Sequence, residues 1–184
     1  MTVKYYDWVE YQSSFRPNKI AIKEISSGKE LSYKTLNDRS KALAGWLQKN
    51  GLEKGDRVAI LSHNCAEVFE LEFACGKIGG IELPLNWRLT KPELQYILND
   101  SSPKALIYSV EFKEIAEALL VDCNIKNSLQ IEENNFSSSY ESAISENNDF
   151  EIVECTHDDL IMLMYTSGTT GHPKGCLLYT SPSP

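Results

Sequence analysis

The segment LIMLMYTSGTTGHPKG, residues 160–175, joins an apolar run to a loop rich in glycine and hydroxyl groups. Leu160–Tyr165 has the length and the continuous apolar character of a β-strand that is buried on both faces. The glycines of the loop that follows allow its backbone to come close to a ligand or to adopt positive φ. A buried strand that leads directly into such a loop predicts a ligand site at the edge of an α/β sheet.

The chain upstream of this segment alternates between helical and strand patterns. Strands are predicted where short apolar runs are bounded by turn residues, at 57–62, 81–85, 104–108 and 129–131. Helices are predicted from amphipathic spacing and capping residues, at 32–50, 64–77 and 90–100 and around 112–119. An alternating order of this kind favours an α/β fold, in which a parallel sheet is flanked by helices on both faces.

Composition limits the classes of function. The 184 residues suffice for one domain or for one and a half, and the formal net charge is -8 without a Lys/Arg-rich run. This balance argues against nucleic acid as a partner, because phosphate backbones need clustered cations. The N-terminus lacks the apolar core of a signal peptide, and no apolar run is long enough to span a membrane, so a cytoplasmic protein is expected.

The loop at 166–175 carries the residues most suited to chemistry. Successive backbone N–H groups and short hydroxyls can surround phosphate oxygens, and Lys174 adds a positive charge at the far end. The spacing does not fit a Walker A loop, because Pro173 precedes Lys174 and Gly175 follows it. The residue types alone leave two interpretations open: polyphosphate binding or a solvated surface loop.

The stretch YTSGTTGHPKG is similar to the signature of the adenylate-forming superfamily, which includes acyl-CoA synthetases, peptide-synthetase adenylation domains and luciferases. Two more stretches resemble the same family: LPLNWRLTKPELQYI at 83–97 and LSYKTLNDRSKALAGWLQKNGLEKGDRVAILSHN at 31–64. Together the resemblance covers most of residues 7–175. The N-W-R-L form is closer to fatty-acyl and aryl CoA ligases than to peptide-synthetase domains.

The resemblance implies a two-step reaction. A carboxylic acid is activated by ATP as an acyl-adenylate, and the thiol of CoA then accepts the acyl group. Cofactor-binding roles carry over to the loop positions that would surround the β- and γ-phosphates and offset their charge, namely Thr166, Ser167, Gly168, Thr169, Thr170, Gly171 and Lys174. Mg²⁺ would arrive on the nucleotide, and no metal ligand is assigned to this chain. A homodimer is left open for the parent protein.

The sequence also departs from the family pattern. The adenylation lysine belongs to a later part of the family, so no catalytic residue is assigned here and the chain alone is expected to be inactive. Residues 1–175 would form part of an N-terminal AMP-binding domain. The Ser/Pro-containing tail at 176–184 is interpreted as foreign to it. The alternatives are a non-catalytic nucleotide-binding or dimer-forming fragment, and an unrelated phosphotransferase.

Four other residues are candidates for lesser roles. Arg88 is expected to form an ion pair or to brace the phosphate loop, and Trp87 to pack locally or to line an acyl pocket. His63 follows a strand and is able to face a cleft. Asp159 precedes an apolar strand and is more typical of a turn or cap than of a metal site. If the strand at 160–165 is the last of the sheet, it forms an exposed apolar edge.

Overall fold

The structure is a computed structural model that describes residues 7–133, 135–146, 149–156, 158–166 and 173–179. Its helices are α1 (Trp8–Phe15), α2 (Tyr33–Lys49), α3 (Ala66–Ile78), α4 (Lys91–Ser101), the 3-10 turn η1 (Val110–Phe112), α5 (Lys113–Asp122) and α6 (Ser139–Ser145). Its strands are β1 (Ile20–Lys23), β2 (Glu30–Ser32), β3 (Arg57–Leu61), β4 (Ile81–Pro84), β5 (Ala105–Ser109), β6 (Asn127–Ile131), β7 (Leu160–Thr166) and β8 (Lys174–Tyr179).

Helix starts follow the capping residues in the sequence. Ser32 precedes α2, and its hydroxyl oxygen accepts a hydrogen bond from the backbone N–H of Thr35 at 3.1 Å. At the start of α4, the Glu93 carboxylate accepts hydrogen bonds from the backbone N–H of Thr90 at 2.8 Å and from its hydroxyl at 2.7 Å. Helix α3 begins at Ala66, two residues later than the predicted start.

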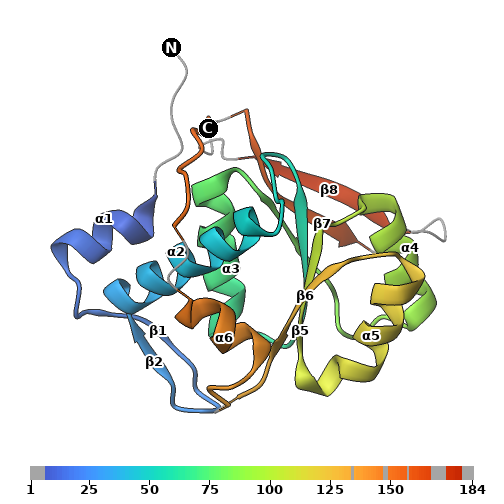
Figure 1. The fold of residues 1–184 in the computed structure, drawn as a ribbon, viewed down its shortest axis with the longest axis horizontal. Coiled ribbons are helices and arrows are strands. Elements are labelled where there is room, and N and C mark those ends of the chain that lie inside the picture. Colours follow the sequence, from blue (N-terminus) through green and yellow to red (C-terminus); the bar gives the residue numbers. More distant parts are fainter. Residues whose placement is uncertain (1–6, 134, 147–148, 157, 167–172, 180–184) are drawn as a thin grey trace.

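The main sheet has the strand order β6-β5-β3-β4-β7-β8 (Figure 1). Strands β3 to β7 are parallel to one another, as the alternating sequence pattern predicts. Strand β8 is antiparallel to β7, which the sequence analysis did not anticipate. The connection at 167–173 is shorter than the dozen or so residues that a parallel crossover needs, so β8 has to turn back as a hairpin.

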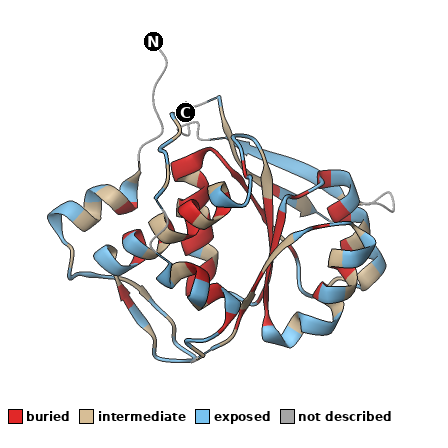
Figure 2. Cartoon of the chain, in the orientation of Figure 1, coloured by how far each residue is buried: buried red, intermediate tan, exposed pale blue. Residues whose placement is uncertain are grey.

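The sheet is covered on both faces, and each face has its own apolar core. Helices α2, α3 and α6 lie on one side, and α4 and α5 lie on the other (Figure 1). Alternate residues of the central strands enter different cores: Val58 and Ile60 contribute to the first, and Ala59 and Leu61 to the second. Figure 2 shows the buried residues concentrated in the central strands and in the helix faces that cover them. The predicted fold class is therefore confirmed.

The expectation that the strand at 160–165 forms the sheet edge is wrong. Strand β7 lies between β4 and β8, and β8 is the edge strand, with every residue exposed. Residues 176–179, which the sequence analysis assigned to a foreign tail, continue β8 as the partners of β7. Residues 180–184 lie outside the described part of the chain, and the division of the chain at residue 175 stays a prediction.

One carboxyl group is buried without a hydrogen-bond partner among the described residues. Glu82 lies on β4 and is 1% exposed, and neither carboxylate oxygen is paired. Burial, with a smaller contribution from the charge of Glu72, raises the pKa of Glu82 to about 8. The side chain is therefore largely protonated at neutral pH.

Candidate functional site

The two ends of the predicted phosphate loop are held together by the β7–β8 hairpin. Thr166 is the last residue of β7, Lys174 is the first residue of β8, and the two are direct partners across the hairpin. Directly opposed residues of an antiparallel pair have Cβ atoms about 5 Å apart, so the hydroxyl and the ammonium group share one face. The remaining predicted loop residues, Ser167, Gly168, Thr169, Thr170 and Gly171, lie outside the described residues.

Lys174 is available to a ligand. Its side chain is exposed, and it has no ion pair with another residue in the part of the chain that the structure describes. Thr166 is likewise exposed at the end of its strand. An unpaired ammonium group beside a hydroxyl at the mouth of a glycine-rich loop suits an anion with several oxygen acceptors, such as a polyphosphate.

Tyr165 anchors the hairpin to the helix layer, a role that the sequence analysis did not identify. Its hydroxyl donates a hydrogen bond to Oδ2 of Asp100 in α4 at 2.5 Å. Burial and the neighbouring Asp100 carboxylate raise the pKa of Tyr165, so the hydroxyl keeps its proton. The apolar character of LIMLMY suggested only a buried strand, and no local pattern links it to Asp100, which lies 65 residues away in the sequence.

The absence of a side chain at Gly175 lets the Tyr165 ring pack closely against the neighbouring strand. Gly175 is the cross-strand partner of Tyr165, and a Cβ atom at Gly175 would lie 3.0 Å from Cδ1 of Leu163 and 3.4 Å from the Tyr165 ring. The final glycine of the motif therefore permits close packing within the hairpin. Because strand side chains alternate, Thr166 and Lys174 lie on the opposite face from Tyr165.

A group of ring side chains lies at the same carboxyl edge of the parallel strands. His63 follows β3, Trp87 follows β4, and Phe112 follows β5. The His63 ring is 4.6 Å from that of Trp87 and 5.1 Å from that of Phe112, measured between centroids. Trp87 therefore packs locally, as one of the two interpretations predicted; an acyl-pocket role is not tested.

The remaining candidates take structural positions. The Arg88 guanidinium lies 4.0 Å from the centre of the Trp87 ring and forms no ion pair within the described residues, so the predicted salt bridge is not found. Asp159 accepts a hydrogen bond from the backbone N–H of Thr156 at 2.7 Å and pairs with Lys54 at 2.9 Å. This contact pattern confirms its interpretation as a turn residue.

The described residues contain neither a cluster of metal ligands nor a membrane-spanning helix. No cluster of His, Cys, Asp and Glu side chains suitable for a metal ion is found there. None of the helices in that part of the chain has the length and apolar character needed to cross a membrane.

The sequence matches the model of one protein family over residues 9–181, and this family is described as AMP-binding enzyme. The chain belongs to the AMP-binding enzyme family. The match includes the predicted phosphate loop, both strands of its hairpin and the cores on the two faces of the sheet. The resemblance predicted from the loop is therefore confirmed at the level of the family.

Several relatives within the AMP-binding family are CoA ligases. The chain is 34% identical to the 3-oxocholest-4-en-26-oate–CoA ligase of Rhodococcus rhodochrous, over 96% of this chain and 33% of the relative. It is also 34% identical to the long-chain-fatty-acid–CoA ligase FadD13 of Mycobacterium tuberculosis, over 94% of this chain and 34% of the relative. The chain thus spans about a third of the length of the curated relatives it matches.

Solved structures of the family share the fold. The inhibitor-bound N-terminal domain of FACL13 from Mycobacterium tuberculosis superposes with a TM-score of 0.84 and 32% identity, over 97% of this chain and 45% of that domain. The anthranilate CoA ligase AuaEII, solved with anthranoyl-AMP, gives a TM-score of 0.88 with 26% identity, over 98% of this chain and 36% of that protein. The α/β architecture is therefore that of the N-terminal region of acyl-CoA synthetases.

Proposed function

We propose that this chain supplies the triphosphate-binding part of an ATP-dependent carboxylic acid–CoA ligase. The observation that carries the proposal is the pairing of Thr166 with Lys174 at the two ends of a glycine-rich loop, in a chain of the AMP-binding family. The loop residues Ser167–Gly171 would surround the β- and γ-phosphates with backbone N–H groups and hydroxyls. Lys174 would offset part of their negative charge.

In the first step, a carboxylate oxygen of the acid attacks the α-phosphorus of ATP. The bond from this phosphorus to the bridging oxygen breaks, and pyrophosphate leaves with the electron pair. In the second step, the CoA sulfur attacks the acyl carbonyl, AMP leaves and the thiol proton passes to solvent. Displacement at phosphorus depends mainly on positioning and on charge neutralisation, which is the role of Thr166, Lys174 and the loop.

Mg²⁺ would enter with ATP, because it is usually held by substrate phosphates and one or two carboxylates. The acid would be of the fatty-acyl or aryl type. The support for this class is the N-W-R-L form at 86–89 and the names of the relatives, which are a steroid-acid ligase, a long-chain fatty-acid ligase and a feruloyl-CoA synthase.

ATP binding to the 184-residue chain tests the role of the loop. We expect Lys174→Ala to weaken binding of ATP by about tenfold, since a hydrogen bond to a charged group contributes about 1.5 kcal/mol or more. Lys126→Ala is the matched control, because Lys126 is an exposed lysine directly before β6, which is the edge strand opposite β8 in the sheet. Titration calorimetry gives both dissociation constants. Equal losses of affinity in the two variants would refute the assignment.

A second experiment separates binding from catalysis. Because the chain covers about a third of its relatives, the groups that complete adenylation are expected in the other two thirds. We expect no acid-dependent ATP–pyrophosphate exchange from the 184-residue chain alone, even where ATP binds. Exchange at a rate typical of a complete ligase would show that the catalytic groups are already present.

A further inference from the structure

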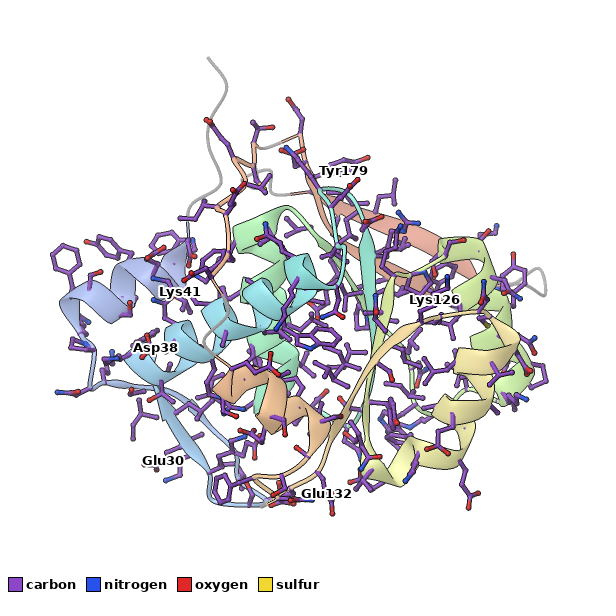
Figure 3. The ribbon with its side chains drawn as sticks, in the orientation of Figure 1. Glu30, Asp38, Lys41, Lys126, Glu132 and Tyr179 are labelled. Atoms are coloured by element: carbon purple, nitrogen blue, oxygen red, sulfur yellow. The ribbon has the colours of Figure 1, made fainter. Side chains whose placement is uncertain are left out.

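A cavity of about 610 Å³ lies at the carboxyl ends of β3, β5 and β6, and its lining includes no described residue of β7 or β8. Its described lining includes His63 and Asn64 after β3, Ser109 at the end of β5, and the turn between β1 and β2. The volume lies within the range of about 300–1,000 Å³ that is usual for small-molecule sites. Figure 3 shows Glu132, another lining residue, at the same end of the molecule as the β1–β2 hairpin.

The topology explains why a cavity forms at this position. Strands β3 and β5 are parallel neighbours, but the chain leaves them toward opposite faces of the sheet. After β3 it enters α3, which packs in the first core, and after β5 it enters α5, which packs in the second. The two connections diverge and leave a crevice between them, which is the position where open α/β sheets bind ligands.

The lining of this cavity is strongly acidic. It contains two cations, Lys29 and Arg39, and six carboxylates, a formal balance of -4: Glu24, Glu67, Glu111, Glu132, Glu133 and Glu141. Both cations are already paired. Lys29 lies 2.6 Å from Glu67, and Arg39 forms ion pairs of 2.6 Å with Glu141 and with the fully buried Glu70. The cavity therefore offers no unpaired cation among its described residues to a phosphate group.

Two of the carboxylates are available to a ligand. Glu111 and Glu133 are exposed and have no hydrogen-bond or ion-pair partner among the described residues. Glu24 is instead occupied, because its carboxylate accepts hydrogen bonds from the backbone N–H of Ala66 and the hydroxyl of Ser27, each at 2.6 Å. The ends of β5 and β6 thus present uncompensated negative charge on one side of the cavity.

Apolar surface accompanies this charge. Phe136 lines the cavity and is 86% exposed, which is unusual for a large aromatic side chain without a partner. The His63 ring also lines it and is fixed by its contact with Trp87. Aromatic faces attract organic cations, and they also cover the apolar part of such a ligand.

We propose that this cavity binds a small organic cation with an apolar body, with its ammonium group between Glu111 and Glu133 and its apolar part against Phe136. No described residue of β7 or β8 lines this cavity, so the site is distinct from the Thr166–Lys174 pair. It goes beyond the proposed ligase reaction, whose substrates are all anions.

Phenethylamine is a suitable probe, and phenethyl alcohol is its uncharged counterpart of similar shape. Titration of the 184-residue chain, followed by NMR or calorimetry, is expected to give about tenfold tighter binding of the amine, the ratio that one charge-assisted hydrogen bond supplies. Equal affinities for the two compounds, or no binding of the amine at millimolar concentration, would overturn the proposal.

Substitutions of the two available carboxylates test whether the amine binds in this cavity. Glu111→Gln/Glu133→Gln is expected to weaken amine binding by about tenfold, again one charge-assisted contact. The matched control is Glu53→Gln/Glu151→Gln, which removes the same charge from exposed positions outside the cavity lining and is expected to change affinity less than twofold. Circular dichroism verifies that each variant is folded. An equal loss in both double variants would show that net charge alone attracts the amine and would contradict the site.

Phe136→Ala tests the apolar contact separately. It is expected to weaken phenethylamine severalfold and methylamine much less, because methylamine has no apolar body to cover and only its charge can interact with the ring. If both amines are weakened alike, the aromatic wall is not part of the site. ATP affinity should stay the same in all these variants, so failure of this proposal and failure of the phosphate-loop proposal are distinguishable.

Discussion

Tyr165, at the end of β7 before the predicted phosphate loop, holds this strand to α4 through one hydrogen bond to Asp100, at 2.5 Å. Tyr165→Phe keeps the ring over Gly175 and removes only this bond. We expect a loss of about 1 kcal/mol in the free energy of unfolding, less than a hydrogen bond to a charged group usually contributes, because Asp100 is exposed. Urea denaturation measures the change. In a double-mutant cycle with Asp100→Asn the two losses should not add, and full additivity would show that the contact contributes nothing.

Glu82 makes the stability of the protein depend on pH. Its pKa of about 8 lies above the ordinary value of 4.5, so the folded state binds its proton more tightly than the unfolded state does. The contribution of protonated Glu82 to the free energy of unfolding is fully present below about pH 4.5 and is lost as the pH rises to about 8. Glu82→Gln stays neutral, so the variant should gain stability relative to the natural protein across this window, by about 3 kcal/mol at neutral pH.

Denaturation curves at several pH values between 5 and 8 measure this difference. The exposed Glu114→Gln is the control, since removing a solvated carboxylate should leave the two pH profiles parallel. If the stability profile of Glu82→Gln runs parallel to that of the natural protein, the pKa of Glu82 does not change on folding, and the prediction is wrong.

At the scale of elements, Arg39 holds three helices together. From α2 its guanidinium pairs with Glu70 of α3 and Glu141 of α6, each at 2.6 Å, and Glu70 is fully buried. Arg39→Met should lower the free energy of unfolding by about 3 kcal/mol, because it leaves a buried carboxylate without a cation. Lys34→Met is the matched control. Its pair with Asp38 on the same helix is exposed, and a loss below about 0.5 kcal/mol is expected. Similar losses from both variants would contradict the bridging role.

The elements themselves were largely predictable, because their signals are local. Ser32 and the Thr90–Glu93 capping box marked helix starts, and continuous apolar runs such as RVAIL marked strands buried on both faces. The burial of Glu82 could not be predicted from such local signals. A glutamate in a strand suggests a solvated face, but β4 is central in the sheet, and its alternate face is covered by α3.

The candidate site was predictable as a motif but not as an arrangement. Thr166 and Lys174 were identified from their residue types and from the resemblance of the motif to the family, and the hairpin places them opposite each other. The Tyr165–Asp100 contact depends on how α4 packs against β7, and the acidic cavity depends on where four separate segments converge. Contacts between residues so distant in sequence leave no periodic pattern, so only the folded chain reveals them.

At the scale of the whole molecule, β8 is an exposed edge of the sheet. It pairs with β7 on one side only, and its apolar side chains Leu177, Leu178 and Tyr179 are 52%, 42% and 49% exposed. An edge strand with this composition is a template for pairing with another chain. We therefore expect the 184-residue chain to associate increasingly with concentration, which sedimentation velocity measures directly.

A charge on this edge should oppose the association, because a lysine would lose its hydration in a strand–strand contact. Leu178→Lys is expected to keep the chain monomeric at concentrations where the natural sequence associates. Val121→Lys is the control, since Val121 is 80% exposed on α5 and away from the edge, and it adds the same charge. If both lysine variants reduce association equally, the effect is not specific to the β8 edge. If neither does, the chain associates through another surface and β8 is not the contact.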